Sequence, residues 1–151
     1  MSARPLLSLL LALWAVALRA QQDPLVEALR KYQSGDLAGA RALVDEAVAS
    51  ERHAANAEAW LLRGYVYKDV FKAKSGTKEG DAARDTARAS LERSLALDAY
   101  STYRENALQA HEFLARSCYN DAAKALAEGN DQRAVLLFDA YRDGVLRLNP
   151  R

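Results

Sequence analysis

The sequence has few of the residues that usually build β-sheets. Its 151 residues contain no isoleucine, eight valines and three threonines, whereas alanine occurs 31 times. Such a chain favours helices, because alanine is the best helix former and β-branched residues are the usual strand formers. The three prolines stand at positions 5, 24 and 150, so no proline interrupts a helix between residues 25 and 149.

The sequence also lacks the patterns that most often mark metal, nucleotide or nucleic-acid binding. One cysteine cannot form an internal disulfide, and two histidines leave little material for a metal site. The chain contains no HExxH or CxxC motif and no phosphate-binding glycine loop. Its 21 basic and 20 acidic residues nearly cancel, which gives no electrostatic reason to expect nucleic acid. We therefore expect no metal and no cofactor.

Cys118 and His111 are candidates for a nucleophile and its base. Cys118 and His111 are seven residues apart on one predicted helix, about 10.5 Å along its axis, which is too far for a hydrogen bond. We expect Cys118 to be a small, buried packing residue that remains a free thiol. His53, in the polar segment 51–55, is expected to be a solvated turn residue. The sequence therefore predicts no enzymatic activity.

The first twenty residues are typical of a secretory signal peptide. Arg4 precedes an uncharged stretch from Pro5 to Leu18, and the segment ends on the small residue Ala20. The alternative is an uncleaved membrane anchor. A helix of this stretch would span only about 21 Å, short of the hydrocarbon thickness of about 30 Å, which favours the signal peptide. We expect cleavage after Ala20, or else after Ala17, and export to the periplasm or beyond. No transmembrane anchor would remain after cleavage.

Caps and helix breakers divide the rest of the chain into six helices. Asp, Asn and Thr residues are expected to cap helix N-termini, and glycines to end helices. Thr102 with Glu105 three residues later has the spacing of a capping box. Residues 75–80 are expected to form a loop. The predicted boundary residues are Asp23-Pro24, Gly35-Asp36, Asn56, Asp81, Thr102, Gly129 and Asn130 or Asp131. The chain is therefore expected to be all-α, with three antiparallel helix pairs over about residues 23–51, 56–98 and 102–149.

The second pair resembles a tetratricopeptide (TPR) repeat. Trp60, Gly64 and Tyr67 have the W-x-x-x-G-x-x-Y spacing of the first helix of that repeat, and Ala87 and Leu91 fit its second helix. The chain departs from the pattern at residue 63, where arginine replaces leucine, and in 11 additional residues before Ala87. The resemblance extends over roughly residues 24–150. It implies that residues 21–151 form three pairs stacked as a short right-handed solenoid, as in small TPR proteins that bacteria export.

The resemblance also assigns residues to the contacts within and between pairs. Small side chains would let helix axes approach to about 8–10 Å, and large ones would fill the gaps between pairs. The residues expected in these contacts are Ala28, Ala40, Trp60, Gly64, Tyr67, Ala87, Leu91, Ala122 and Phe138. On the predicted fifth helix, residues 108, 111, 115, 118, 122 and 126 would share one packing stripe.

The resemblance further implies that the concave face, formed by the first helix of each pair, binds a protein or peptide. Aromatic residues among scattered polar ones suit an extended peptide or a partner helix. The lysine and asparagine clamp of the chaperone-tail-binding members is absent, since Leu61 and Tyr65 occupy those positions. The expected contact residues are Tyr32, Glu58, Leu61, Tyr65, Lys68, Lys72 and Tyr119. This predicts an exported, non-catalytic scaffold, unless these tyrosines are ordinary surface and packing residues.

The lysines of segment 68–78 allow a second interpretation. Lys68, Lys72, Lys74 and Lys78 could hold an anionic partner or envelope surface, which would make the protein an envelope-associated module. Alternatively the segment is a solvated helix extension whose nearby acids offset the charge. An enzyme of unknown type is the third possibility.

The predicted sixth helix leaves apolar residues without a neighbour in the sequence. Its inward stripe is expected to contain Ala134, Leu137, Phe138, Tyr141, Val145 and Leu148. Val135, Leu136 and Leu146 lie outside that stripe. They predict weak self-association or docking of a larger partner at this end of the chain, unless they form a tolerated wet surface.

Overall fold

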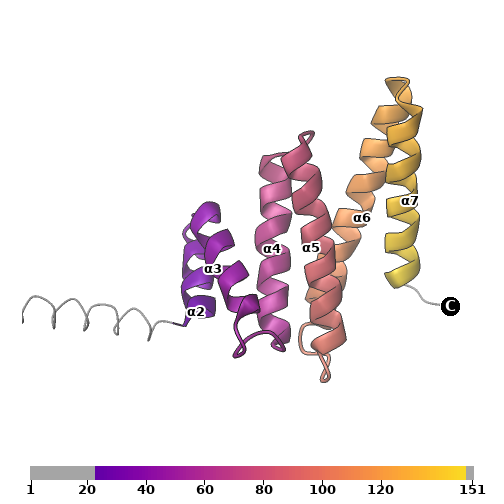
Figure 1. Cartoon of the computed structure of the whole chain (residues 1–151). Coiled ribbons are helices and arrows are strands. Elements are labelled where there is room, and N and C mark those ends of the chain that lie inside the picture. Colours follow the sequence, from indigo (N-terminus) through magenta and orange to yellow (C-terminus); the bar gives the residue numbers. More distant parts are fainter. Residues whose placement is uncertain (1–22, 149–151) are drawn as a thin grey trace, which may run out of the picture.

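The computed structural model describes residues 23–148, and all regular secondary structure within this range is helical. The helices are α2 (Pro24–Gln33), α3 (Leu37–Ala49), α4 (Ala57–Ala73), α5 (Lys78–Leu97), α6 (Arg104–Ala127) and α7 (Asp131–Leu148). They stand side by side in chain order and run alternately up and down (Figure 1). This confirms the all-α prediction. The expected signal peptide and the expected last residue of the final pair lie outside the described residues. None of the helices between residues 23 and 148 is long and apolar enough to cross a membrane.

Several helix boundaries follow the predicted caps. The Asp23 carboxylate accepts a hydrogen bond from the Leu25 amide at 2.9 Å, with Pro24 as the first helical residue of α2. Gly35 ends that helix with φ of +81°, a backbone conformation that glycine adopts without strain. Asn56 caps α4 by accepting from the Glu58 amide at 2.8 Å. Such caps satisfy backbone N–H groups that have no partner within the helix.

Two predicted boundaries are wrong. Helix α5 begins at Lys78, not at Asp81, because the Thr77 hydroxyl accepts from the Gly80 amide at 3.0 Å and so caps the helix one turn earlier. The capping box of Thr102 does not form. The Asp98 carboxylate instead accepts from the amides of residues 102 and 103, at 2.9 and 2.7 Å, and α6 begins at Arg104.

Each helix packs against its neighbours in the sequence, and α4 also contacts α2 and α6. Two apolar core clusters result, and α4 contributes to both. The first lies between α2, α3 and α4 and contains Leu25, Ala28, Ala40, Val44, Ala47, Ala59, Leu62 and Val66. The second lies between α4, α5 and α6 and contains Leu61, Tyr67, Val70, Phe71, Ala83, Ala87, Leu91, Ala107, Ala110 and Leu114. Helix α4 is therefore buried on two sides and forms the centre of the domain.

Arginine at position 63, which departs from the repeat pattern, links α3, α4 and α5. Its Nε donates to Asp45 Oδ1 and its Nη1 donates to Ser90 Oγ, both at 2.8 Å. The guanidinium carbon also lies 4.8 Å from the centroid of the Tyr67 ring. A leucine would leave the buried Ser90 hydroxyl and the Asp45 carboxylate without these bonds, which explains why a polar residue suits this position.

Most residues expected in packing contacts are buried. The four alanines of that set and Leu91 have no exposed surface, and Tyr67 is 6% exposed. Trp60 and Phe138 are only partly buried. The Trp60 indole donates to the Ala54 carbonyl at 2.9 Å, and the Phe138 ring packs against Tyr119. These two rings therefore also face solvent.

Two further expectations are corrected by the tertiary contacts. Leu126 was assigned to the buried stripe of the fifth helix, but it is 54% exposed, and Ala125 is buried instead. His53 was expected to be solvated, but it is buried, and its Nε2 lies 2.7 Å from Asp23 Oδ1. This contact ties the loop before α4 to the start of α2, 30 residues earlier.

Candidate partner-binding groove

An open groove of about 540 Å³ crosses α2, α4 and α6. We call it the inner groove. Its lining residues are Tyr32 from α2, Tyr65, Lys68 and Lys72 from α4, and Asn106, Gln109, Ala110 and Phe113 from α6. The α4 residues are spaced three and four apart, as are the α6 residues, so each set lies on one helical face. Tyr32 stands at the end of α2 and closes one side of the groove.

An aspartate beside the groove organises its α2 and α4 residues. The Tyr32 hydroxyl donates to Asp69 Oδ2 at 2.6 Å, and Lys72 Nζ lies 3.4 Å from Oδ1 of the same carboxylate. Lys68 Nζ is 3.9 Å from that oxygen. Burial and the hydrogen bond to Asp69 hold the pKa of Tyr32 well above its usual value. Tyr32 therefore remains a neutral hydrogen-bond donor that fixes α2 against α4.

Tyr65 makes the corresponding link between α4 and α6. Its hydroxyl donates to the Asn106 main-chain carbonyl at 3.4 Å. Lys68 Nζ lies 5.0 Å from the centroid of the Tyr65 ring, within the range of a cation–π interaction. Burial raises the pKa of the Tyr65 hydroxyl. The Tyr65 side chain is thus held in place by the hydrogen bond to α6 and by the contact with Lys68.

The inner groove combines charge, amides and aromatic surface. Two lysines face one carboxylate, so these groups carry a local charge of +1. The side chains of Asn106 and Gln109 can both donate and accept hydrogen bonds. Phe113 is 44% exposed and adds an apolar surface at the edge. The lining residues of the groove include no pair of a nucleophile and a histidine base.

The structure brings four of the predicted contact residues together and separates the other three. Tyr32, Tyr65, Lys68 and Lys72 line the inner groove, whereas Leu61 is 6% exposed and belongs to the second core cluster. Glu58 is exposed in the first turn of α4 but does not line the groove.

Tyr119 also lies outside the inner groove. Its ring packs edge-on against Phe138 and Tyr141 of α7, with centroid distances of 5.7 and 5.4 Å. Asp69 and the groove residues of α6 were not predicted. The three- and four-residue spacing on α6 was available in the sequence, but it could not show which helix this face would meet.

The lysines of segment 68–78 are largely paired with acids. Lys68 and Lys72 both approach Asp69, and Lys74 Nζ lies 3.5 Å from Glu79 Oε2. Glu79 also lies 3.6 Å from the Arg41 guanidinium of α3. Surface pairs of this kind are weak, but they reduce the positive field that a purely anionic partner would need.

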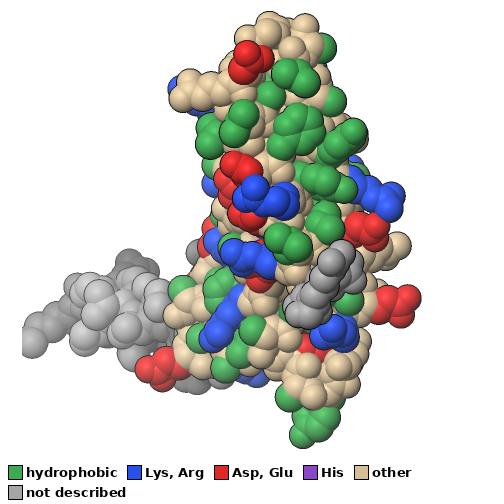
Figure 2. Space-filling view, turned by 90° about the vertical axis from the view of Figure 1, so that its right-hand side faces the viewer, with side chains coloured by type: hydrophobic (Ala, Val, Ile, Leu, Met, Phe, Trp, Pro, Cys, Tyr) green, Lys and Arg blue, Asp and Glu red, His purple; other side chains and the backbone are tan. Residues whose placement is uncertain are grey.

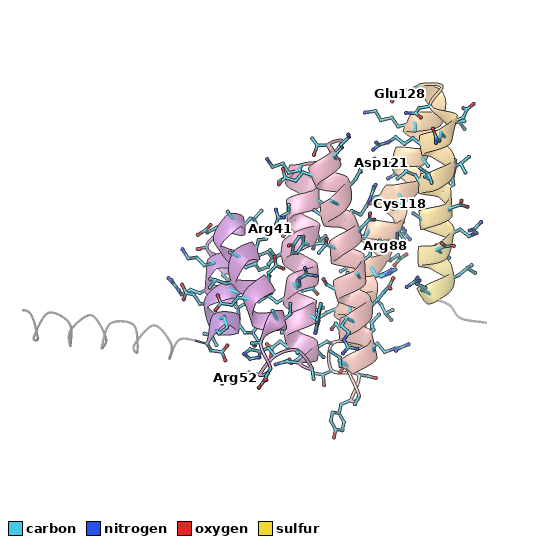
Figure 3. The ribbon with its side chains drawn as sticks, viewed as in Figure 1. Arg41, Arg52, Arg88, Cys118, Asp121 and Glu128 are labelled. Atoms are coloured by element: carbon cyan, nitrogen blue, oxygen red, sulfur yellow. The ribbon has the colours of Figure 1, made fainter. Side chains whose placement is uncertain are left out.

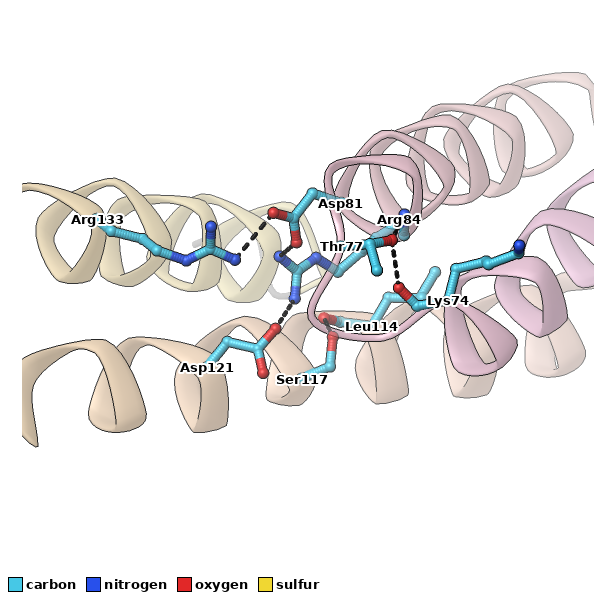
Figure 4. Close-up of polar contacts among 9 residues, drawn as sticks. Lys74, Thr77, Asp81, Arg84, Leu114, Ser117, Asp121 and Arg133 are labelled. Atoms are coloured by element: carbon cyan, nitrogen blue, oxygen red, sulfur yellow. Dashed lines mark hydrogen bonds and ion pairs between the residues drawn. The ribbon is translucent and has the colours of Figure 1, made fainter. Parts of the chain in front are cut away.

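A second polar cluster lies where α5 meets α6 and α7. Arg84 is 2% exposed and donates to Asp121 Oδ2 at 2.6 Å and to Asp81 Oδ1 at 3.0 Å (Figure 4). The other oxygen of Asp81 accepts from Arg133 at 2.9 Å. The Arg84 guanidinium also lies 5.0 Å from the centroid of the Phe71 ring. These charges are stabilised by one another and hold the last two helices against α5.

Cys118 lies close to this polar cluster and is 1% exposed (Figure 3). Burial raises the pKa of its thiol, while Arg84 and Arg88 lower it to a lesser extent. His111 Nε2 lies 3.2 Å from Glu92 Oε1, so the histidine is engaged with a different side chain. Within residues 23–148, no group of three or more His, Cys, Asp and Glu side chains is arranged to hold a metal ion.

Comparison of the chain with protein-family models, curated proteins and solved structures finds no match. The geometry of the chain's own residues therefore carries the function proposed below.

Proposed function

We propose that this protein is an exported, non-catalytic scaffold that binds a protein or peptide segment in the inner groove. The observation that carries the proposal is that α2, α4 and α6, the first helices of the three pairs, all contribute to one groove. The sequence pattern of residues 1–20, which is typical of a signal peptide, supports a periplasmic or secreted location.

We further propose that the helices form a TPR-like right-handed solenoid of the pairs α2–α3, α4–α5 and α6–α7. Contacts between the helices support this arrangement. The backbone of helix α4 lies close to both α2 and α6. Helices α3 and α5, and helices α5 and α7, meet through long side chains, as in the ion pairs of Arg41 with Glu79 and of Arg133 with Asp81. In such a stack the first helices of the pairs line the inner face. The close approach of Gly64 to Leu91 within the second pair fits the same interpretation.

The lining residues define what kind of segment fits best. Asn106 and Gln109 can hydrogen-bond the main chain of an extended peptide, whose own groups are otherwise unpaired. Lys68 and Lys72 favour an acidic side chain on that peptide, and Phe113 and Tyr65 favour an aromatic or aliphatic one. We therefore expect a peptide that carries an acidic residue near an apolar residue, bound with modest affinity because the groove is open.

The test is selection of peptides from a displayed random library by the purified protein, followed by fluorescence polarisation with the enriched sequences. Tyr65→Ala and Lys72→Glu should each weaken binding by about tenfold, which is typical of removing a central contact. Lys124→Glu is the matched control, since Lys124 is an exposed lysine of α6 outside the inner groove. Capture of partners from the cells that export the protein should show the same dependence. Equal binding by all three variants would contradict the proposal.

The alternative is an envelope-associated module that holds an anionic surface through residues 68–78. The exposed ends of Lys72 and Lys74 favour it, and their pairing with Asp69 and Glu79 weakens it. Salt distinguishes the two functions, because charge-driven binding weakens steeply with ionic strength and groove binding through apolar contacts weakens less. An enzyme, the third possibility, would be recognised only by turnover.

A further inference from the structure

The face of α6 and α7 that points away from α5 is rich in apolar side chains. We call it the end face. On it lies an open hollow of about 750 Å³, and Leu108, Ala115, Tyr141 and Val145 form its apolar lining. Leu146, next to Val145 on α7, is 56% exposed. Figure 2 looks onto this side of the molecule and shows apolar side chains gathered mainly over its upper half, with charged side chains among those lower down. Exposed apolar patches of a few hundred Å² commonly mark an interaction surface.

The charges around the hollow are mixed and balanced. Arg104, Arg116, Glu105 and Glu112 line it, two of each sign. Within the described residues Arg104 makes no ion pair, and the Glu112 carboxylate is bonded through Oε1 to Arg116, which leaves Oε2 without a partner. A surface with no net charge does not select a strongly charged partner. It suits a partner that offers the same mixture of charges, as a second copy does.

The spacing on α6 is self-complementary. Arg104, Leu108 and Glu112 stand four residues apart on successive turns of one helical face. If two copies meet with their α6 helices antiparallel around a two-fold axis at Leu108, each Arg104 lies opposite the partner copy's residue 112. The same contact is made twice, as an isologous interface requires. Leu108 then lies at the centre of the contact, with Val145 of α7 also lining the hollow.

We propose that this protein forms a weak two-fold dimer through the lower half of the end face, centred on Leu108, with reciprocal pairs between Arg104 and Glu112. Three turns of two adjacent helices present a face of about 16 by 20 Å, which is about 300 Å² per copy. This is well below the about 800 Å² per partner of a standard stable interface. The dimer should therefore dissociate in the micromolar to millimolar range. Because Gln109 lines both the hollow and the inner groove, the dimer places two inner grooves near one another.

The interface does not include all the exposed apolar residues of the third pair. Val135 is 59% exposed but lies near the turn between α6 and α7, beyond the antiparallel contact. Leu136 is 65% exposed but lines a cleft with Asp81 and Arg84 of α5 instead of the end face. The sequence grouped these two residues with Leu146, and the structure separates them.

Sedimentation equilibrium of the purified protein from about 10 µM to about 1 mM tests the proposal, since a weak interface dissociates within this range. We expect a reversible monomer–dimer equilibrium without larger species. Arg104→Glu and Glu112→Arg should each raise the dissociation constant by about tenfold or more, because each places like charges opposite one another. The double variant R104E/E112R restores opposite charges and should return the constant to within about threefold of the original.

Two controls place the contact on the end face. Val145→Glu should weaken the dimer as strongly as the single charge changes, because Val145 lines the hollow. Val135→Glu, on the same helix but near the turn between α6 and α7, should leave the dimer unchanged. None of the four positions is buried, and circular dichroism would verify that each variant keeps its helices. A monomer at all concentrations, or failure of the double charge exchange to restore association, would overturn the proposal. Species larger than a dimer, if Val26→Glu on α2 abolishes them, would also overturn the proposal. Such species would indicate head-to-tail association of the copies.

Discussion

The contact between Gly64 of α4 and Leu91 of α5 allows the packing of the central helices to be tested quantitatively. A Cβ at Gly64 would lie 2.6 Å from Leu91 Cδ2 and 2.7 Å from Cγ. Leu91 is completely buried, so its side chain cannot turn away into solvent. Overpacking of this kind costs about 1–3 kcal/mol, while replacing a helical glycine by alanine gains up to about 1 kcal/mol. Gly64→Ala should therefore lower the free energy of unfolding by up to about 2 kcal/mol, and the larger Gly64→Leu by more.

A double-mutant cycle separates the clash from the gain in helix propensity. Leu91→Ala removes the clashing atoms, at a cost of about 2–5 kcal/mol for the cavity. In that background Gly64→Ala should become stabilising by about 1 kcal/mol, because the propensity gain remains and the clash is gone. The coupling free energy between the two positions should be about 1–3 kcal/mol.

Urea denaturation followed by circular dichroism would give all four free energies of unfolding. The slopes with denaturant should agree among the variants, since the surface exposed on unfolding hardly changes. If Gly64→Ala has the same effect in both backgrounds, within about 0.5 kcal/mol, the two residues are not coupled. The register between α4 and α5 described above would then be wrong.

Two further predictions concern titratable groups of α5 and α6. The hydrogen bond from His111 and the positive charge of Arg147 lower the pKa of Glu92 below its ordinary 4.5. Burial acts in the opposite direction but is outweighed. The ionised carboxylate therefore stabilises the folded state above that pH, and this contribution is lost as pH falls through the lowered pKa. Glu92→Gln should make the free energy of unfolding fall less steeply below about pH 4.5 in urea titrations; an unchanged slope would contradict the coupling. Because Cys118 is buried and its thiol pKa is raised, a thiol reagent should label it slowly in the native protein and rapidly in urea. Fast native labelling would show that the thiol is accessible.

Local features of the sequence determined the helical class and several helix boundaries. Alanine content and the absence of internal proline favour helices whatever the helices pack against. The caps Asp23, Asn56 and Asn130 act within one helical turn of their own positions, so they can be read from a few residues. Prediction failed where two local caps competed. Thr77 caps α5 one turn before Asp81, and at the start of α6 Asp98 accepts from the amides of residues 102 and 103. Any of these short polar side chains can bond free backbone amides at a helix start, so the sequence alone did not select between them.

The inner groove was predictable only within single helices. Tyr65, Lys68 and Lys72 share a face by their spacing, and this face follows from the helical period alone. Asn106, Gln109 and Phe113 have an equally regular spacing, but they join the groove only because α6 crosses beside α4, some 40 residues later in the chain. Spacing fixes which residues share a face. It does not fix which face of another helix lies opposite.

Only the tertiary structure decided which charged and polar groups are buried. His53 was expected to be solvated, yet Asp23 reaches it across 30 residues, and Arg84 is buried between Asp81 and Asp121. A charged or polar side chain can leave water only if partners arrive to replace the lost hydrogen bonds. Those partners come from separate helices, so the identity of each pair depends on how the helices stack. The sequence determined that the chain would form helices, and the packing of those helices selected which acids meet which bases.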